Sequence, residues 1–118
     1  MLNSISLNKN GDFRRMYRRK SVVGPVLVTY FSKNRYGYNR VGITASKKIG
    51  KAYERNRARR VIREAYRLLE PLLCTDDGWD IVFVARVRTT LCPMQEVYYL
   101  MKKHLTPLLR HNNDEKGC

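Results

Sequence analysis

The chain has 118 residues, which is the length of one domain, and 43% of them are hydrophobic, enough to form a buried core. Lysine and arginine number 24 and aspartate and glutamate 10, so the formal net charge of +14 makes nucleic acid the leading partner and an anionic membrane surface the weaker one. Neither an apolar run near the roughly 18–20 residues that span a membrane nor an apolar signal-peptide stretch is visible, so we expect a cytoplasmic protein with no membrane partner.

The first predicted element is a short amphipathic helix over residues 9–20. Phe13, Met16 and Tyr17 recur at the i, i+3, i+4 spacing of one helix face. Basic residues surround this face: Arg14, Arg15, Arg18, Arg19 and Lys20.

Two strands are predicted next. Residues 26–32 are β-branched and aromatic, which is typical of a strand. Residues 33–39 contain Gly37 and predict a hairpin loop. We therefore expect residues 40–45 to return as the second strand of a hairpin.

The longest helical pattern covers residues 54–73. At about 100° per residue, its apolar side chains fall within an arc of roughly 120°, which must pack against a sheet or another helix. This stripe comprises Ala58, Val61, Ile62, Ala65, Leu68, Leu69 and Leu72. Pro71 lies inside the pattern, so we expect the regular helix to end near Leu69 or Glu70.

The last elements are a strand and a helix. The unbroken apolar run of residues 80–87 predicts a strand covered on both faces. Pro93 suits the first turn of a final helix, and Pro107 limits its end. Its apolar face comprises Met94, Val97, Tyr98, Met101 and Leu105. This order of elements predicts a small α+β sandwich with helices on one side of a short sheet, and it permits a parallel β-α-β crossover.

The basic residues gather in residues 47–67, where nine of them stand against two acids, a net contribution of +7. Arg59, Arg63 and Arg67 put like charges on adjacent turns, which destabilises an isolated helix. Phosphates between the guanidinium groups would relieve this repulsion, because arginine binds phosphate bidentately. A solvated charged face is the alternative, and the shortage of balancing acid favours nucleic acid over it.

This segment reads Lys47-Lys48-Ile49-Gly50, followed by Arg55-Asn56-Arg57, Arg60 and Arg63-Glu64. Further motifs flank it: Leu7, Lys9, Asn10, Asp12 and Phe13 near the start, Arg40-Val41-Gly42 before it and Trp79-Asp80-Ile81-Val82 after it. Together they closely resemble the bacterial ribonuclease P protein component. The resemblance implies a fold like the second domain of ribosomal protein S5, with a left-handed crossover where general statistics favour a right-handed one.

In that family the protein is the small subunit of a ribonucleoprotein endonuclease that removes the 5′ leader of precursor tRNA. The RNA subunit holds the catalytic centre with Mg²⁺, so we expect no catalytic residue in this chain and two partners, the catalytic RNA subunit and precursor tRNA. We expect a single RNA-binding domain over residues 1–110 and a disordered polar tail over residues 111–118.

Two sets of site residues follow from the basic helix and the resemblance. The set expected to bind the RNA subunit is Lys47, Lys51, Arg55, Asn56, Arg57, Arg59, Arg60, Arg63 and Arg67. Asn56 is equally suited to hydrogen-bonding a neighbouring loop. The set expected to form a leader-binding cleft is Phe13, Arg14, Tyr17, Tyr30 and Lys48. Phe31 is an alternative to Tyr30, and core packing is the alternative role for all these rings.

The sequence offers few residues that could form a catalytic site within this chain. A protein-only nuclease needs clustered carboxylates or a placed histidine pair, but only Asp76 and Asp77 adjoin, and His104 and His111 fall in different segments. The three cysteines are far apart and odd in number, so we expect free thiols and no metal site. The alternatives to a ribonuclease P subunit are a non-catalytic ribosomal or RNA-assembly protein and, less well supported, a metal-dependent nuclease.

Overall fold

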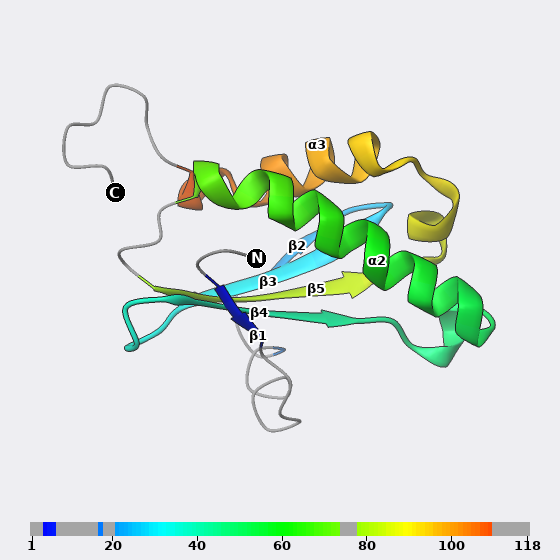
Figure 1. The fold of residues 1–118 in the computed structure, drawn as a ribbon, viewed down its shortest axis with the longest axis horizontal. Helices are drawn as coiled ribbons and strands as arrows, with labels where there is room; N and C mark the ends of the chain where they lie inside the picture. The colour runs from blue at the N-terminus through cyan, green and yellow to red at the C-terminus, as the bar shows by residue number, and fades with distance from the viewer. Residues whose placement is uncertain (1–3, 7–16, 18–20, 74–77, 110–118) are drawn as a thin grey trace.

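The computed structural model describes residues 4–6, 17, 21–73 and 78–109 (Figure 1). Within them, a five-stranded sheet carries two helices on one of its faces. The strands are β1 (Ser4–Ser6), β2 (Ser21–Val23), β3 (Leu27–Lys33), β4 (Asn39–Thr44) and β5 (Trp79–Ala85). The helices are α2 (Ala52–Leu69) and α3 (Met94–His104), and the short 3₁₀ segments are η1 (Lys47–Ile49), η2 (Glu70–Leu72), η3 (Val87–Leu91) and η4 (Thr106–Leu108). The predicted α+β sandwich is confirmed.

Several predictions fall outside the described residues. They include the first predicted helix, over residues 9–20, with Phe13 and Arg14; of that helix the structure describes Tyr17 alone. The tail over residues 111–118 also lies outside the described residues. The same holds for Asp76, Asp77 and His111. Those assignments stay predictions.

The strand order is β1-β4-β5-β3-β2, so the predicted hairpin of β3 with β4 is wrong. Each of these strands pairs with β5 instead, β3 antiparallel and β4 parallel. The reason is the apolar character of β5, whose Ile81, Val82 and Phe83 are all fully buried. A strand of this kind is most stable at the centre of a sheet, covered on both faces.

The parallel pair β4 and β5 is joined through α2, as predicted. In Figure 1, β4 lies in front of β5, both arrows point to the right, and α2 lies above the sheet. This arrangement makes the crossover left-handed, which is rare. The family resemblance therefore predicted the hand correctly where general statistics did not.

The main core lies between the sheet and the two helices. From α2 it takes Ala58, Ile62, Ala65, Tyr66 and Leu69. Leu68 and Leu72, predicted in the stripe, are 42% and 40% exposed. Leu68 is exposed because the buried side of α2 is centred nearer to Tyr66, whose ring packs on Phe83. Leu72 is exposed because α2 ends at Leu69, so Leu72 no longer follows the 3.6-residue period of the helix.

The second helix, α3, packs beside α2 and over β3. Val97, Met101 and Leu105 are buried as predicted, and Pro93 directly precedes the helix. His104 ends α3 and is buried, with Nδ1 2.9 Å from Oγ1 of Thr29 on β3. This contact fixes α3 to the sheet.

Candidate nucleic-acid interface

The face of the sheet opposite α2 and α3, here called the second face, holds a small apolar cluster of Tyr30, Val82 and Val84. Tyr30 lies opposite Val82 in the pairing register. The ring of Tyr17 meets that of Tyr30 edge to face, with centroids 5.1 Å apart. Tyr17 is 43% exposed and Tyr30 is half-buried, so the structure brings these two predicted site residues together at the surface and not in the main core.

Phe31, the alternative to Tyr30, lies on the other side of β3. Its side chain is buried in the main core and its ring packs against Trp79, with centroids 6.0 Å apart. Successive residues of a strand point to opposite faces. Tyr30 is therefore the aromatic residue of β3 that shares a face with Tyr17.

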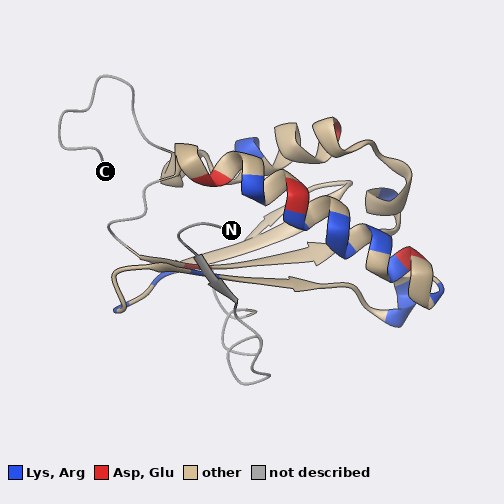
Figure 2. Ribbon diagram, viewed as in Figure 1, with Lys and Arg blue, Asp and Glu red and all other residues tan. Residues whose placement is uncertain are grey.

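The basic residues predicted to bind the RNA subunit lie along α2 and just before it (Figure 2). Exposed members of the set are Lys47, Lys51, Asn56, Arg57, Arg60, Arg63 and Arg67, whereas Arg55 and Arg59 are half-buried. Within α2, the exposed members of the set thus lie away from the buried residues of the apolar stripe, as expected for an amphipathic helix.

Two arginines of the set also bond within the protein. Arg57 donates from Nε to the carbonyl oxygen of Thr90 at 3.3 Å, which ties α2 to η3. Arg59 donates to the carbonyl oxygen of Ala45 at 3.3 Å and to Oδ1 of Asn56 at 3.1 Å. Asn56 therefore has a partner on its own helix.

The remaining arginines of α2 differ in their surroundings. Arg67 pairs with Glu64 at the surface, and its hydrogen bond lowers the pKa of that carboxyl, so the charges balance there. Arg60 and Arg63 have no hydrogen-bond or ion-pair partner among the described residues, which leaves both guanidinium groups available to phosphate. Nε of Arg55 is buried and likewise unpartnered within the described part of the chain.

The start of α2 is set by the short segment that holds Lys48. Lys48 is exposed on η1, and Gly50 follows with a φ of 148°, which few other residues adopt. The backbone N–H of Lys51 then donates to Oε1 of Glu54 at 3.1 Å, satisfying a free N–H at the helix start. A Cβ at position 50 would come within 2.7 Å of the Glu54 carboxylate, which caps the helix, and would also be strained by the positive φ, so this turn favours glycine.

Sequence reasoning missed Arg86 and Arg88. Together with Pro25 and Val87 they line a shallow hollow of about 360 Å³. Because β4 and β5 are parallel, the segments that follow them, η1 and η3, lie at the same end of the sheet. Arg86 itself reaches towards the turn between β2 and β3, where it donates from Nη1 to the carbonyl oxygen of Gly24 at 3.0 Å, so the two arginines form a separate basic spot at that end of the sheet. Their signal in the sequence was a pair of arginines directly after a buried strand.

The described residues contain no group of three or more His, Cys, Asp or Glu side chains placed to hold a metal ion. Burial lowers the pKa of His104, and its contact with Thr29 gives it a structural role. The described part of the chain also contains no helix long and apolar enough to cross a membrane.

Comparison with known proteins supports the resemblance seen in the sequence. The family model "Ribonuclease P" matches residues 1–109. The ribonuclease P protein component of Clostridioides difficile (strain 630) is 51% identical over 87 residues, which cover 69% of this chain and 71% of that protein. That of Thermoanaerobacter sp. (strain X514) is 39% identical over 111 residues, covering 92% of this chain and 94% of the relative.

Solved structures agree with these matches. The Staphylococcus aureus RNase P protein superposes with a TM-score of 0.74 at 29% identity, covering 86% of this chain and 93% of that one. The RNase P protein from Thermotoga maritima gives a TM-score of 0.67 at 28% identity, covering 88% and 94%. From its sequence and its fold, the chain belongs to the ribonuclease P protein component family.

Proposed function

We propose that the chain is the protein subunit of ribonuclease P. In this role it binds the catalytic RNA subunit and the 5′ leader of precursor tRNA, and it assists endonucleolytic removal of the leader to give the mature 5′ end. The observation that carries the proposal is the outward face of α2, where Arg60 and Arg63 are exposed without a partner among the described residues. Such guanidinium groups suit the phosphates of a structured RNA.

Two separate surfaces support binding of two RNA molecules at once. The arginines lie on α2, in the helix layer, whereas the rings of Tyr17 and Tyr30 lie on the second face of the sheet. The sheet itself stands between them. An RNA subunit on α2 therefore leaves the tyrosines free for a second strand.

The second face suits an unpaired strand. Aromatic rings stack on single-stranded bases without requiring a particular sequence, which suits leaders that differ between tRNAs. Lys48, exposed at one end of the sheet, offers a charge for a leader phosphate. Mature tRNA has no leader, so this surface distinguishes substrate from product.

The reaction itself belongs to the RNA subunit in this proposal. Mg²⁺ prefers oxygen ligands, chiefly carboxylates and phosphates, and the described residues of this chain gather arginine, lysine and tyrosine at both surfaces. The Mg²⁺ ions therefore act mainly with the RNA, which supplies the catalytic centre, while this chain binds and orients. We place the assembly in the cytoplasm.

Reconstitution tests the proposal. Purified protein alone should leave precursor tRNA intact at low Mg²⁺, and adding the matching RNA subunit should restore cleavage at the mature 5′ end. Cleavage by the protein alone would indicate a protein nuclease. An RNA subunit whose activity does not change when the protein is added would indicate the RNA-assembly alternative.

A further inference from the structure

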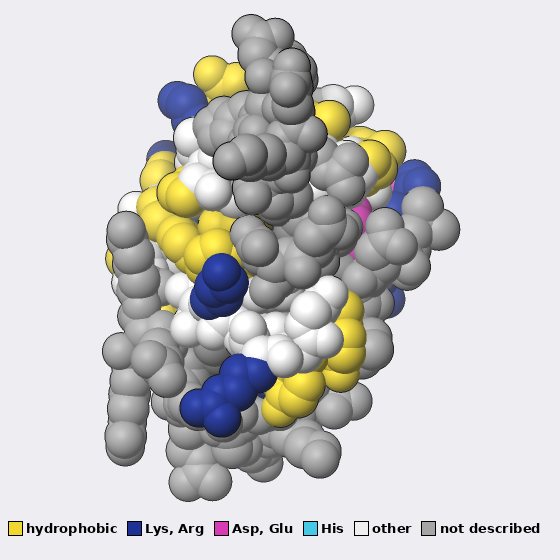
Figure 3. Space-filling model, turned by 90° about the vertical axis from the view of Figure 1, so that its left-hand side faces the viewer, with side chains coloured by type: hydrophobic (Ala, Val, Ile, Leu, Met, Phe, Trp, Pro, Cys, Tyr) yellow, Lys and Arg dark blue, Asp and Glu magenta, His cyan; other side chains and the backbone are white. Residues whose placement is uncertain are grey.

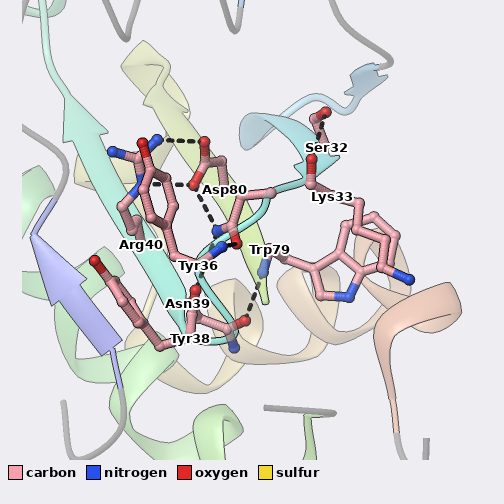
Figure 4. Close-up of polar contacts among 9 residues, drawn as sticks. Ser32, Lys33, Tyr36, Tyr38, Asn39, Arg40, Trp79 and Asp80 are labelled. Atoms are coloured by element: carbon pink, nitrogen blue, oxygen red, sulfur yellow. Dashed lines mark hydrogen bonds and ion pairs between the residues drawn. The ribbon is translucent and has the colours of Figure 1, made fainter. Parts of the chain in front are cut away.

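The loop between β3 and β4 carries two exposed aromatic rings, Tyr36 and Tyr38, which are 53% and 37% exposed (Figure 4). Their ring centroids lie 5.6 Å apart. Cζ of Arg40 lies 4.4 Å from the centroid of the Tyr36 ring, a cation–π contact. The ring of Tyr36 is thus in contact with Arg40 and close to Tyr38, and about half of its surface stays exposed.

The guanidinium under Tyr36 is itself fixed. Arg40 donates from Nε and Nη2 to the two carboxylate oxygens of Asp80, at 2.8 and 2.7 Å. Both side chains are largely buried, at 15% and 12% exposure. The contact therefore places Tyr36 on a rigid base.

The loop backbone is equally constrained. Asn34 donates from Nδ2 to the carbonyl oxygen of Tyr38 at 3.0 Å and to Asp80 at 2.9 Å, and its Oδ1 accepts from the N–H of Tyr36 at 2.9 Å. Gly37 between the two rings has a φ of 74°, a conformation that favours glycine. The rings are preorganised, so binding a ligand costs little ordering of the loop.

This loop and the tyrosine pair Tyr17–Tyr30 share the second face of the sheet. In the pairing register Tyr30 lies opposite Val82, and Arg40 lies opposite Asp80, two residues along β5. Residues two apart on a strand point to the same face. Strand geometry puts the Cα atoms of Tyr30 and Arg40 about 12 Å apart, at most about three or four stacked nucleotides.

The charge around the loop suits a phosphate chain. Lys33 and Arg35 are exposed on either side of Asn34, and residues 21–53 contain no acid. Figure 3 views the molecule from the end where this loop lies and shows Lys and Arg side chains beside exposed hydrophobic ones. Exposed rings flanked by basic residues are the arrangement that binds single-stranded nucleic acid.

We propose that the β3–β4 loop extends the leader-binding surface. Bases of the leader farther from the cleavage site than those at Tyr30 stack on Tyr36, and Lys33 and Arg35 contact their phosphates. The direction follows from the fold: Lys48 and the start of α2 lie at one end of β4, and the loop lies at the other. A leader that emerges beside the RNA subunit on α2 passes Tyr30 first. This inference rests on the proposed function.

The test is a series of precursor tRNAs whose leaders lengthen one nucleotide at a time, with affinity for the reconstituted holoenzyme measured for each. The affinity of the wild type should rise once when the leader is long enough to reach Tyr30 and a second time when it reaches Tyr36. Tyr36→Ala should lose only this second rise, a loss of roughly 5–150-fold for one stacked base. Tyr36→Phe keeps the ring and should retain the gain. Tyr99→Ala is the matched control, because Tyr99 is exposed with Lys103 over its ring but lies on α3.

The outcomes separate this inference from the proposed function. If Tyr36→Ala binds long leaders as the wild type does, the extension is wrong, whatever Tyr30→Ala does to short leaders. If Tyr36→Ala weakens mature and precursor tRNA alike, the loop contacts another part of the RNA, and the inference is also wrong. Loss of the first stage in Tyr30→Ala reports on the proposed cleft alone. Melting temperatures of all variants distinguish lost binding from lost folding.

Discussion

The rings of Tyr17 and Tyr30 meet edge to face at an interplanar angle of 64° on the side of the sheet away from the helices. Tyr30 in turn rests on Val82, which is fully buried. One partner is thus anchored in the sheet and the other is exposed. An unpaired base can pack against this exposed ring pair without opening the main core.

The arginines of α2 should control the salt dependence of RNA-subunit binding. Each phosphate contact removed lowers the slope of log K against log salt by roughly 0.7–0.9. The double variant Arg60→Ala, Arg63→Ala should therefore lower the slope by about 1.4–1.8 in a filter-binding titration. An unchanged slope would place the RNA elsewhere.

The matched control removes two charges from the other helix. Lys102 and Lys103 are exposed in the last turn of α3 and are not in the predicted set. Lys102→Ala, Lys103→Ala should leave the slope at its wild-type value. Equal changes in both double variants would mean that net charge, and not the face of α2, determines the slope.

The pair Arg40–Asp80 should stabilise the sheet. Asp80→Asn leaves the Arg40 guanidinium without its carboxylate in a largely buried position, which costs about 3 kcal/mol, the lower end of the range for buried pairs. Urea unfolding measures this loss. Glu64→Gln, which breaks an exposed pair, should leave the midpoint unchanged, and a similar shift in both variants would contradict the distinction.

His104 should make stability depend on pH. Burial lowers its pKa in the folded state, so the unfolded chain takes up the proton first, near its ordinary pKa of about 6.5. Stability is then fully present above that value and falls as the pH drops below it towards the folded pKa. Urea midpoints at pH 7.5 and 5.5 should differ more in the wild type than in His104→Gln, which does not titrate. Equal differences would show that other groups cause the dependence.

Local patterns predicted much of this fold. The 3.6-residue period located α2 and α3, and Pro71 located the end of α2 at Leu69. The insertion of β5 between β3 and β4 could not be predicted this way, because pairing between distant segments leaves no local signal. The strands β1 and β2, three residues each, are too short to show a period.

Part of the candidate site could likewise be predicted from local sequence patterns, and part could not. Exposure of Arg60 and Arg63 follows from helical phase, and alternation along β3 separates Tyr30 from Phe31. The contact of Arg86 with Gly24 at the turn between β2 and β3 depends on the antiparallel pairing of β3 with β5, which only the folded chain shows. The left-handed crossover likewise came from the family resemblance and not from periodicity.

The central claim is that two faces of this protein bind two different RNAs. The most direct test compares the affinities of surface variants for each RNA. Affinities for the RNA subunit, precursor tRNA and mature tRNA are compared for Tyr17→Ala, Tyr30→Ala and the Arg60→Ala, Arg63→Ala variant. Each tyrosine variant should weaken the holoenzyme's binding of precursor tRNA by roughly 5–150-fold, with mature tRNA and the RNA subunit bound as before. The arginine variant should weaken the RNA subunit and keep the ratio of precursor to mature affinity. Equal losses for precursor and mature tRNA in the tyrosine variants, together with a lower melting temperature, would contradict the account.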